Sequence, residues 1–170
     1  VAPDGTVYVP NARCGGGQSV AVSTDAGLTW TVRTHPESRT GSTDPSIGIS
    51  KDAPTGSATS NRIYMAWDGP VPTPTPAPNT TPPPASPDNH AFVAYSDDRG
   101  VTWSKPYDIG ASLGIKNAVF PSVVVGDRDR AAVAFLGTRM SGDHQAADFP
   151  GTWYGLVAHT YDGGQTWTTV

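Results

Sequence analysis

The chain has 170 residues, of which 19 are glycine, 17 are proline and only 15% are charged. It contains one Glu and three Lys, too few of the residues that long helices require, whereas Val, Thr, Tyr and Trp fill its apolar segments; we therefore expect an all-β fold. A net charge of −4 without any basic run argues against a nucleic-acid partner, and no apolar stretch reaches the roughly 18–20 residues of a membrane helix.

Short apolar runs bounded by turn residues predict the strands of this fold. In chain order they are residues 5–9, 18–23, 44–50, 61–67, 90–96, 120–126, 129–135 and 155–160. The pair 44–50 and 61–67 resembles the pair 120–126 and 129–135, since each is two apolar runs joined by a turn. The chain therefore repeats one supersecondary unit.

Three eight-residue segments, 23–30, 96–103 and 160–167, share one pattern and each ends in tryptophan. Each begins with a hydroxyl side chain and has Asp at position three, Gly at position five and Thr-Trp at its end. This spacing predicts a hairpin turn, because Asp accepts hydrogen bonds from the backbone ahead of it and Gly readily takes positive φ. We expect each tryptophan to bury its ring at the start of the following strand. The shared positions are Asp25, Gly27, Trp30, Asp98, Gly100, Trp103, Asp162, Gly164 and Trp167.

The repeated unit is strand, turn, strand, loop, strand, Asp turn, strand, which is the plan of an antiparallel propeller blade. It divides the chain into a partial blade at 1–33, which lacks its first strand, and full blades at 44–106 and 117–170. The octet closely resembles the Asp box of bacterial neuraminidase repeats, which occur in the sialidase-like β-propeller superfamily. The resemblance implies about three four-stranded antiparallel blades of a six-bladed ring. Because an open stack leaves unpaired edges, we expect the remaining blades in a longer chain or, alternatively, in a second copy.

The two ends of such a propeller have different roles. The Asp turns all join strand three to strand four, so they share one end and are expected to be structural. The resemblance places an active site at the opposite end. The loops expected there are residues 11–18, 33–44, 68–90 and 137–154.

Sialidases hold a sugar carboxylate with three arginines and use a Tyr nucleophile, activated by Glu, with an Asp as acid/base. The candidates here are Arg13, Arg39 and Arg139 for substrate binding, and Glu37, Asp44 and Tyr154 for catalysis, with Asp68, Asp143 and Asp148 as further carboxylates. Asp44 stands at the start of an inner strand. The residue at the same position in the last blade is Phe120. The Phe/Tyr-Arg-Ile-Pro motif of the family is absent, so no catalytic role is carried over to a residue.

Some residues in the chain are of types that can bind a metal, form a disulfide or carry a sugar. Residues 126–130 and 142–148 place carboxylates close together, the latter with His144, but neither has an established ligand spacing; we expect neither metal nor cofactor. Cys14 is the only cysteine, so it is either a small loop residue or the partner of a cysteine elsewhere. The proline-rich loop 69–89 predicts an extended, exposed excursion that contains a formal glycosylation site at Asn79.

Two functions follow from the resemblance and the candidate residues. One is a secreted exo-sialidase-type glycoside hydrolase, which requires three convergent arginines and a Tyr/Glu pair. The other is a non-catalytic propeller that binds glycan or protein, or serves as a cell-surface or assembly component, which the single Glu favours. Both imply a secreted or cell-surface protein; the sugar, the linkage and the oligomeric state are not determined by the sequence. The chain opens like the interior of a domain, which is compatible with a removed leader.

Overall fold

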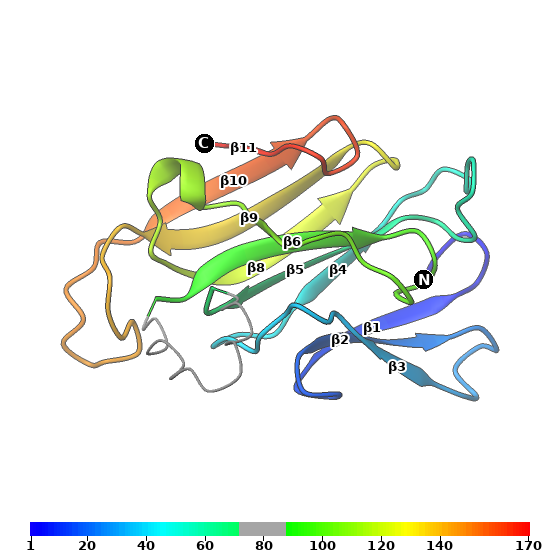
Figure 1. Cartoon of the computed structure of the whole chain (residues 1–170), viewed down its shortest axis with the longest axis horizontal. Coiled ribbons are helices and arrows are strands. Elements are labelled where there is room, and N and C mark those ends of the chain that lie inside the picture. Colours follow the sequence, from blue (N-terminus) through cyan, green and yellow to red (C-terminus); the bar gives the residue numbers. More distant parts are fainter. Residues whose placement is uncertain (72–87) are drawn as a thin grey trace, which may run out of the picture.

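The computed structural model describes residues 1–71 and 88–170, and this part of the chain is all-β apart from one short 3-10 turn, η1 (Ala111–Leu113). Its eleven strands form three antiparallel sheets whose strands follow chain order (Figure 1). Sheet A contains β1 (Val7–Ala12), β2 (Gln18–Ser23) and β3 (Thr31–Thr34). Sheet B contains β4 (Ser46–Ile49), β5 (Ile63–Gly69), β6 (His90–Ser96) and β7 (Tyr107–Asp108). Sheet C contains β8 (Asn117–Val125), β9 (Ala131–Thr138), β10 (Tyr154–Thr160) and β11 (Thr168–Thr169).

The all-β prediction is confirmed, as are three antiparallel sheets built from the expected apolar runs. The predicted proline-rich excursion and Asn79 fall within residues 72–87, outside the described residues. The described part of the chain has no helix with the length and hydropathy needed to cross a membrane.

Sheet B lies between the other two sheets and is apolar on both faces. Successive strand residues point to opposite faces, so β5 sends Tyr64 and Ala66 toward sheet C and Ile63 toward sheet A. All seven residues of β5 are buried as a result. Val133 and Phe135 of β9 complete the core between sheets B and C.

The three Asp-box turns share one hydrogen-bond pattern, which the structure repeats residue for residue. In the last turn, Asp162 Oδ1 accepts from the Thr160 hydroxyl at 2.8 Å and from the Thr166 amide at 3.0 Å, while Oδ2 accepts from the Thr166 hydroxyl at 2.6 Å. Asp25 and Asp98 accept the equivalent bonds from the first and seventh residues of their own octets. Each carboxylate is therefore used within its turn, as expected for a structural residue.

The Asp-box tryptophans differ in burial, contrary to the expectation that all three are buried. Trp167 is 7% exposed and packs edge-on against Tyr64 of sheet B, and Trp103 packs between sheets A and B. Trp30 is 45% exposed. The physical reason is that the buried Trp167 and the half-buried Trp103 each pack against the preceding sheet, and no sheet precedes sheet A in the described residues.

The Asp boxes predict an acid-dependent loss of stability. Hydrogen bonds from Thr29 and from Thr166 lower the pKa values of Asp25 and Asp162 from 3.8 to about 2. Because the folded-state pKa lies below the unfolded value, this contribution to stability is fully present above pH 3.8 and is lost as the pH falls toward 2. The measurement is the melting temperature as a function of pH for the wild type, Asp162→Asn and Thr166→Val.

We expect both variants to melt at lower temperature than the wild type at neutral pH and to lose less on acidification. If Asp162→Asn and the wild type lost the same number of degrees between neutral pH and about pH 2, the Asp162 carboxylate would not be the group that titrates.

Candidate functional site

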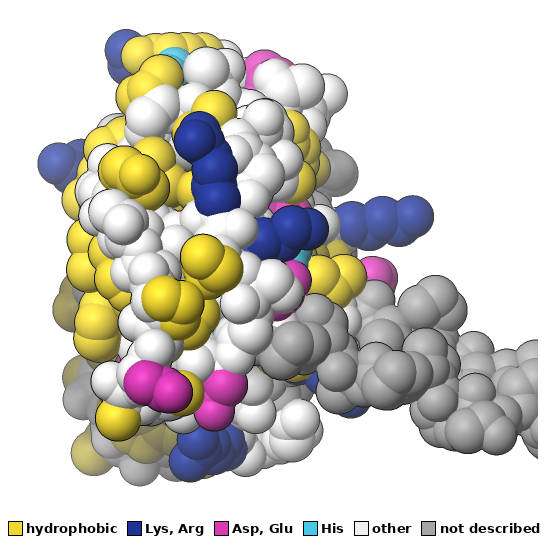
Figure 2. All heavy atoms as spheres, turned by 90° about the vertical axis from the view of Figure 1, so that its left-hand side faces the viewer, with side chains coloured by type: hydrophobic (Ala, Val, Ile, Leu, Met, Phe, Trp, Pro, Cys, Tyr) yellow, Lys and Arg dark blue, Asp and Glu magenta, His cyan; other side chains and the backbone are white. Residues whose placement is uncertain are grey.

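The loops at the end opposite the Asp-box turns form the candidate site (Figure 1). Within the described residues they follow the strands β1, β3, β7 and β9; the sequence predicted those after β1, β3 and β9. Figure 2 views this end and shows Lys and Arg side chains projecting beside carboxylates. The loops 35–45 and 139–153 meet at the end of β5, where the described side chains form a groove.

A fully buried carboxylate, Asp68 near the end of β5, organises this groove. Asp68 accepts hydrogen bonds from the backbone amides of Ser42 and Thr43, at 2.7 and 3.1 Å, and from both of their hydroxyls. The Nδ2 of Asn89 donates a further bond at 2.5 Å. A charge buried this deeply is stable only when it is fully hydrogen-bonded, and five donors supply that here.

The loop that presents these donors lies directly against β5. A Cβ atom placed on Gly41 would come within 2.1 Å of the Asp68 carbonyl oxygen, so only glycine fits this approach. The loop begins at His35, which is 1% exposed and packs between the rings of Trp67 and Trp103 at 5.2 and 5.7 Å. The loop is thus fixed at its start, by His35, and at the groove itself, by Gly41.

Two asparagines connect this carboxylate to sheet C. The amide of Asn89 donates to Asn117 Oδ1 at 2.9 Å, and Asn89 Nδ2 donates to the Ala118 carbonyl at 2.8 Å. Asn117 Nδ2 in turn donates to the carbonyls of Met140 and Gly142, at 2.8 and 3.1 Å. Buried side-chain amides therefore hold the loop after β9 against the end of sheet B.

The groove has a polar half and an apolar half. The polar half is a cleft of about 450 Å³ lined by Thr40, Gly41, Ser42, Pro70, Asp88, Asn89, Asp143, His144 and Gln145. The apolar half is a cleft of about 430 Å³ lined by Ser42, Thr43, Val119, Phe120, Leu136, His144, Gln145 and Trp153. Ser42, His144 and Gln145 line both halves, so the two clefts adjoin.

Phe120 in the apolar half has a strained backbone. Its φ is +56° at a bulge in β8, and the residue is 64% exposed. A bulky residue in the left-handed region is uncommon and costs on the order of 1–3 kcal/mol, a cost that concentrates at functional sites. A strained residue therefore lines the apolar half of the groove, as is typical of functional sites.

His144 joins the two halves of the groove. Its Nε2 lies 3.0 Å from Ser42 Oγ, and its ring meets Trp153 edge-on at 6.3 Å. Its Nδ1 is buried and has no hydrogen-bond partner among the described residues. The accessible contribution of His144 to the groove is therefore its ring and its Nε2, which is engaged with Ser42.

The order Asp68–Ser42–His144 differs from that of a serine hydrolase. There the histidine lies between the carboxylate and the serine, so that it can take the hydroxyl proton. Here the Ser42 hydroxyl lies in the middle and donates to Asp68 at 2.7 Å. Ser42 is therefore a positioning residue, and the arrangement is suited to binding.

The predicted substrate-binding and catalytic residues all lie at this end but do not line the groove. Arg13, Arg39 and Glu37 are exposed, and Arg139 is exposed with its Nε donating to the Leu113 carbonyl at 2.9 Å. Within residues 1–71 and 88–170, no ion pair joins any of the three arginines to a carboxylate. Tyr154 is 50% exposed at the start of β10. Their roles stay predictions.

The remaining carboxylates divide between the groove and the solvent. Asp143 lines the polar half, whereas Asp44 and Asp148 are exposed outside it. The described residues contain no group of three or more His, Cys, Asp or Glu placed to hold a metal ion. Cys14 is an exposed free thiol.

Sequence reasoning missed Ser42, Asn89, Phe120 and Trp153 as groove residues. The available signal was the departure from the repeat: Phe120 stands where the preceding unit has Asp44. Asp68 and His144 were named as candidates, but their convergence depends on how the loops fold across the end of β5.

Comparison with known protein families identifies one segment of the chain. Residues 94–105, which include the second Asp box, match the BNR/Asp-box repeat. The chain therefore contains a repeat of the sialidase-like type at sheet B. No curated protein matches the chain.

Replacing Asp68 tests whether its charge organises the groove. We expect Asp68→Asn to lower the free energy of unfolding by about 3 kcal/mol, because an amide group would face the backbone donors of Ser42 and Thr43. The matched control is Asp44→Asn, an exposed neighbour, which should change stability by less than about 0.5 kcal/mol. Urea unfolding measures both; equal effects of the two substitutions would contradict the assignment.

Proposed function

We propose that the three sheets are consecutive blades of a six-bladed β-propeller, which binds a glycan in the groove between sheets B and C. The blades correspond to residues 1–33, 44–106 and 117–170. Three observations support the blade arrangement: the strand order within each sheet, the shared Asp-box geometry, and the apolar cores on both faces of sheet B. The BNR/Asp-box repeat at residues 94–105 supports the same arrangement.

The groove's two adjoining halves are the observation that favours a carbohydrate ligand. A sugar ring presents hydroxyl groups around its edge and C–H groups on its faces. The polar half offers hydroxyl, amide, carboxylate and imidazole groups, and the apolar half offers the rings of Phe120 and Trp153. A small number of polar groups next to an aromatic surface is typical of sites that bind small ligands.

Binding without hydrolysis is the better-supported activity. Asp68 is saturated by five donors and is inaccessible, so it is unsuited to proton transfer. Asp88 accepts from the Ser141 hydroxyl and the Gly142 amide, which leaves Asp143 as the exposed carboxylate lining the groove. Sialidase-type hydrolysis needs a Tyr nucleophile activated by Glu, and the candidates Tyr154 and Glu37 do not line either half of the groove.

Exo-sialidase-type hydrolysis is the second candidate. One observation favours it: Arg13, Arg39 and Arg139 are exposed on loops at the groove end, where arginines suit an acidic sugar. Both activities fit a secreted or cell-surface protein.

Glycan binding is tested by titration calorimetry with sialyllactose and with lactose. We expect Trp153→Ala to weaken binding about tenfold, the equivalent of one aromatic contact worth about 1.4 kcal/mol. The control Tyr107→Ala removes a partly exposed aromatic ring from β7, outside the groove, and should leave the affinity unchanged.

Release of sialic acid from a fluorogenic sialoside separates the two candidates. Turnover would replace the binding proposal with hydrolysis. Absence of both binding and turnover would refute a glycan-directed function for the groove. Preference for sialyllactose over lactose would assign the exposed arginines to the ligand carboxylate.

A further inference from the structure

The polar half of the groove is negatively charged. Asp143 lines it from the loop after β9, and Asp88 lines it from the segment before β6. Asp68 lies one hydrogen bond behind this lining, because the Ser42 hydroxyl that lines the cleft donates to it at 2.7 Å. Three carboxylates therefore lie at one cleft, and no Lys or Arg is among the described residues that line either half.

The buried charge of Asp68 has no countercharge in the chain. Its five donors are the amides and hydroxyls of Ser42 and Thr43 and the side-chain amide of Asn89, all of which are neutral. Within residues 1–71 and 88–170 it takes part in no ion pair, and residues 72–87 contain no charged side chain. Buried charges are normally paired with an opposite charge or a metal ion. Asp68 is therefore hydrogen-bonded but not neutralised.

His144 does not supply the missing positive charge. The single proton of the Ser42 hydroxyl is donated to Asp68, so Ser42 Oγ accepts from His144 Nε2 at 3.0 Å. The other ring nitrogen, Nδ1, is buried and has no hydrogen-bond partner in the part of the chain that the structure describes. A proton on Nδ1 would be buried without an acceptor, so the neutral ring with its proton on Nε2 fits this geometry.

Asp143 is the carboxylate that a ligand can reach. It is exposed, and its Oδ1 accepts from the Gln145 amide at 3.0 Å, which holds the carboxylate at the cleft. No Lys or Arg of the described residues forms an ion pair with it. The described chain also has no group of three or more His, Cys, Asp or Glu placed to hold a metal ion. An organic cation therefore suits this cleft better than a metal ion.

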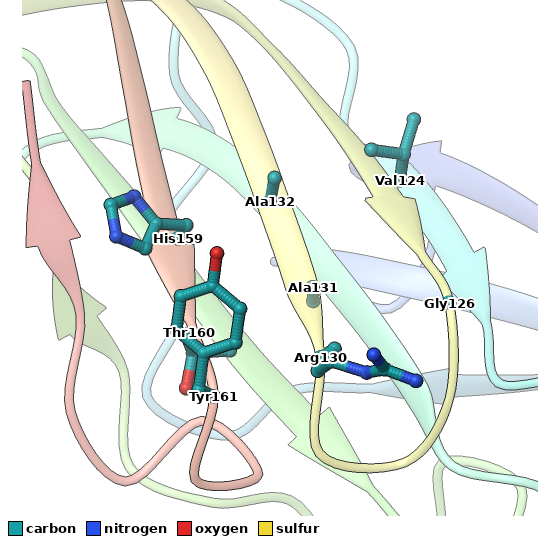
Figure 3. A pocket seen from close by; sticks show the side chains of 8 residues that line it. All are labelled: Val124, Gly126, Arg130, Ala131, Ala132, His159, Thr160 and Tyr161. Atoms are coloured by element: carbon teal, nitrogen blue, oxygen red, sulfur yellow. The ribbon is translucent and has the colours of Figure 1, made fainter.

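Two other hollows of the chain lack this negative charge. The hollow of about 220 Å³ shown in Figure 3 is lined by Arg130 and His159, and its described lining contains no Asp or Glu. The described lining of a second hollow of about 330 Å³, which includes Phe135 and Leu156, also contains neither. The carboxylates at the groove are therefore not a general result of the net charge of −4.

We infer that the glycan bound in the groove carries a protonated amino group, as an amino sugar with a free amine does. The ammonium group lies in the polar half, where it donates to Asp143 and compensates the charge of Asp68. The C–H face of the sugar packs against Trp153, whose ring meets His144 edge-on. An acidic sugar is disfavoured, because its carboxylate would face two negative charges. The inference rests on the proposed glycan binding and adds the sign of the ligand charge.

Titration calorimetry near neutral pH, with the glucosamine disaccharide and its N-acetylated form, tests the sign of this charge. The two ligands share one sugar skeleton, but only the first carries charged amines. We expect the wild type to bind the glucosamine form about tenfold more tightly, the effect of one hydrogen bond to a charged group.

Two variants of the loop after β9 separate charge from shape. Asp143→Asn should remove most of the preference, whereas a steric effect of the acetyl group would survive this substitution. The matched control is Asp148→Asn, which changes an exposed carboxylate of the same loop outside the groove and should retain the full preference. Circular dichroism verifies that both variants are folded.

The outcomes distinguish this inference from the proposed function. Equal affinity for the two disaccharides, tighter binding of the acetylated form, or a preference that Asp143→Asn leaves unchanged would overturn the positive charge but not glycan binding. Tighter binding of sialyllactose than of lactose would overturn it in the same way. Absence of binding to all four sugars would refute glycan binding and this inference together, and binding of a lysine-containing peptide alone would assign the groove to a protein partner instead.

Discussion

A sheet with two apolar faces must be covered on both sides, and this constraint governs the whole molecule. Sheet B meets it within the chain, since β5 is buried along its full length between sheets A and C. Within the described residues, sheets A and C each pack one face against sheet B, whereas Trp30 and Val124 are exposed. The alternation of side chains along β5 therefore builds two apolar cores, one on each face of sheet B.

The groove is built from polar contacts at the place where apolar packing ends. Asp68 belongs to β5 and is fully buried, yet its partners come from the loop that follows sheet A and from the residue that precedes β6. Five donors converge on its two carboxylate oxygens, and Asn117 extends the connection to the loop after β9. A neutral side chain at this position would leave backbone amides of Ser42 and Thr43 without a charged acceptor.

The repeat made the sheets predictable, because each strand carries its own apolar run and each Asp turn carries its own hydrogen bonds. The same local logic identified Asp25, Asp98 and Asp162 as structural. The groove was only partly predictable, because Ser42, Asn89 and Trp153 come from three loops whose sequences contain no motif. Burial of Trp30 was wrongly expected, since the octet encodes the turn while the neighbouring sheet decides whether the ring is covered.

The self-contained hydrogen bonding of the Asp-box turns has a consequence for how the sequence can change. Because the turns are held by their own octets and by neighbouring residues at the same end, such as Arg33 and Arg62, they do not depend on the loops at the other end. Substitutions and insertions in those loops can alter ligand preference while the sheets remain intact, provided that the contacts to Asp68 persist. The fold thereby separates the residues that maintain it from those open to selection or engineering.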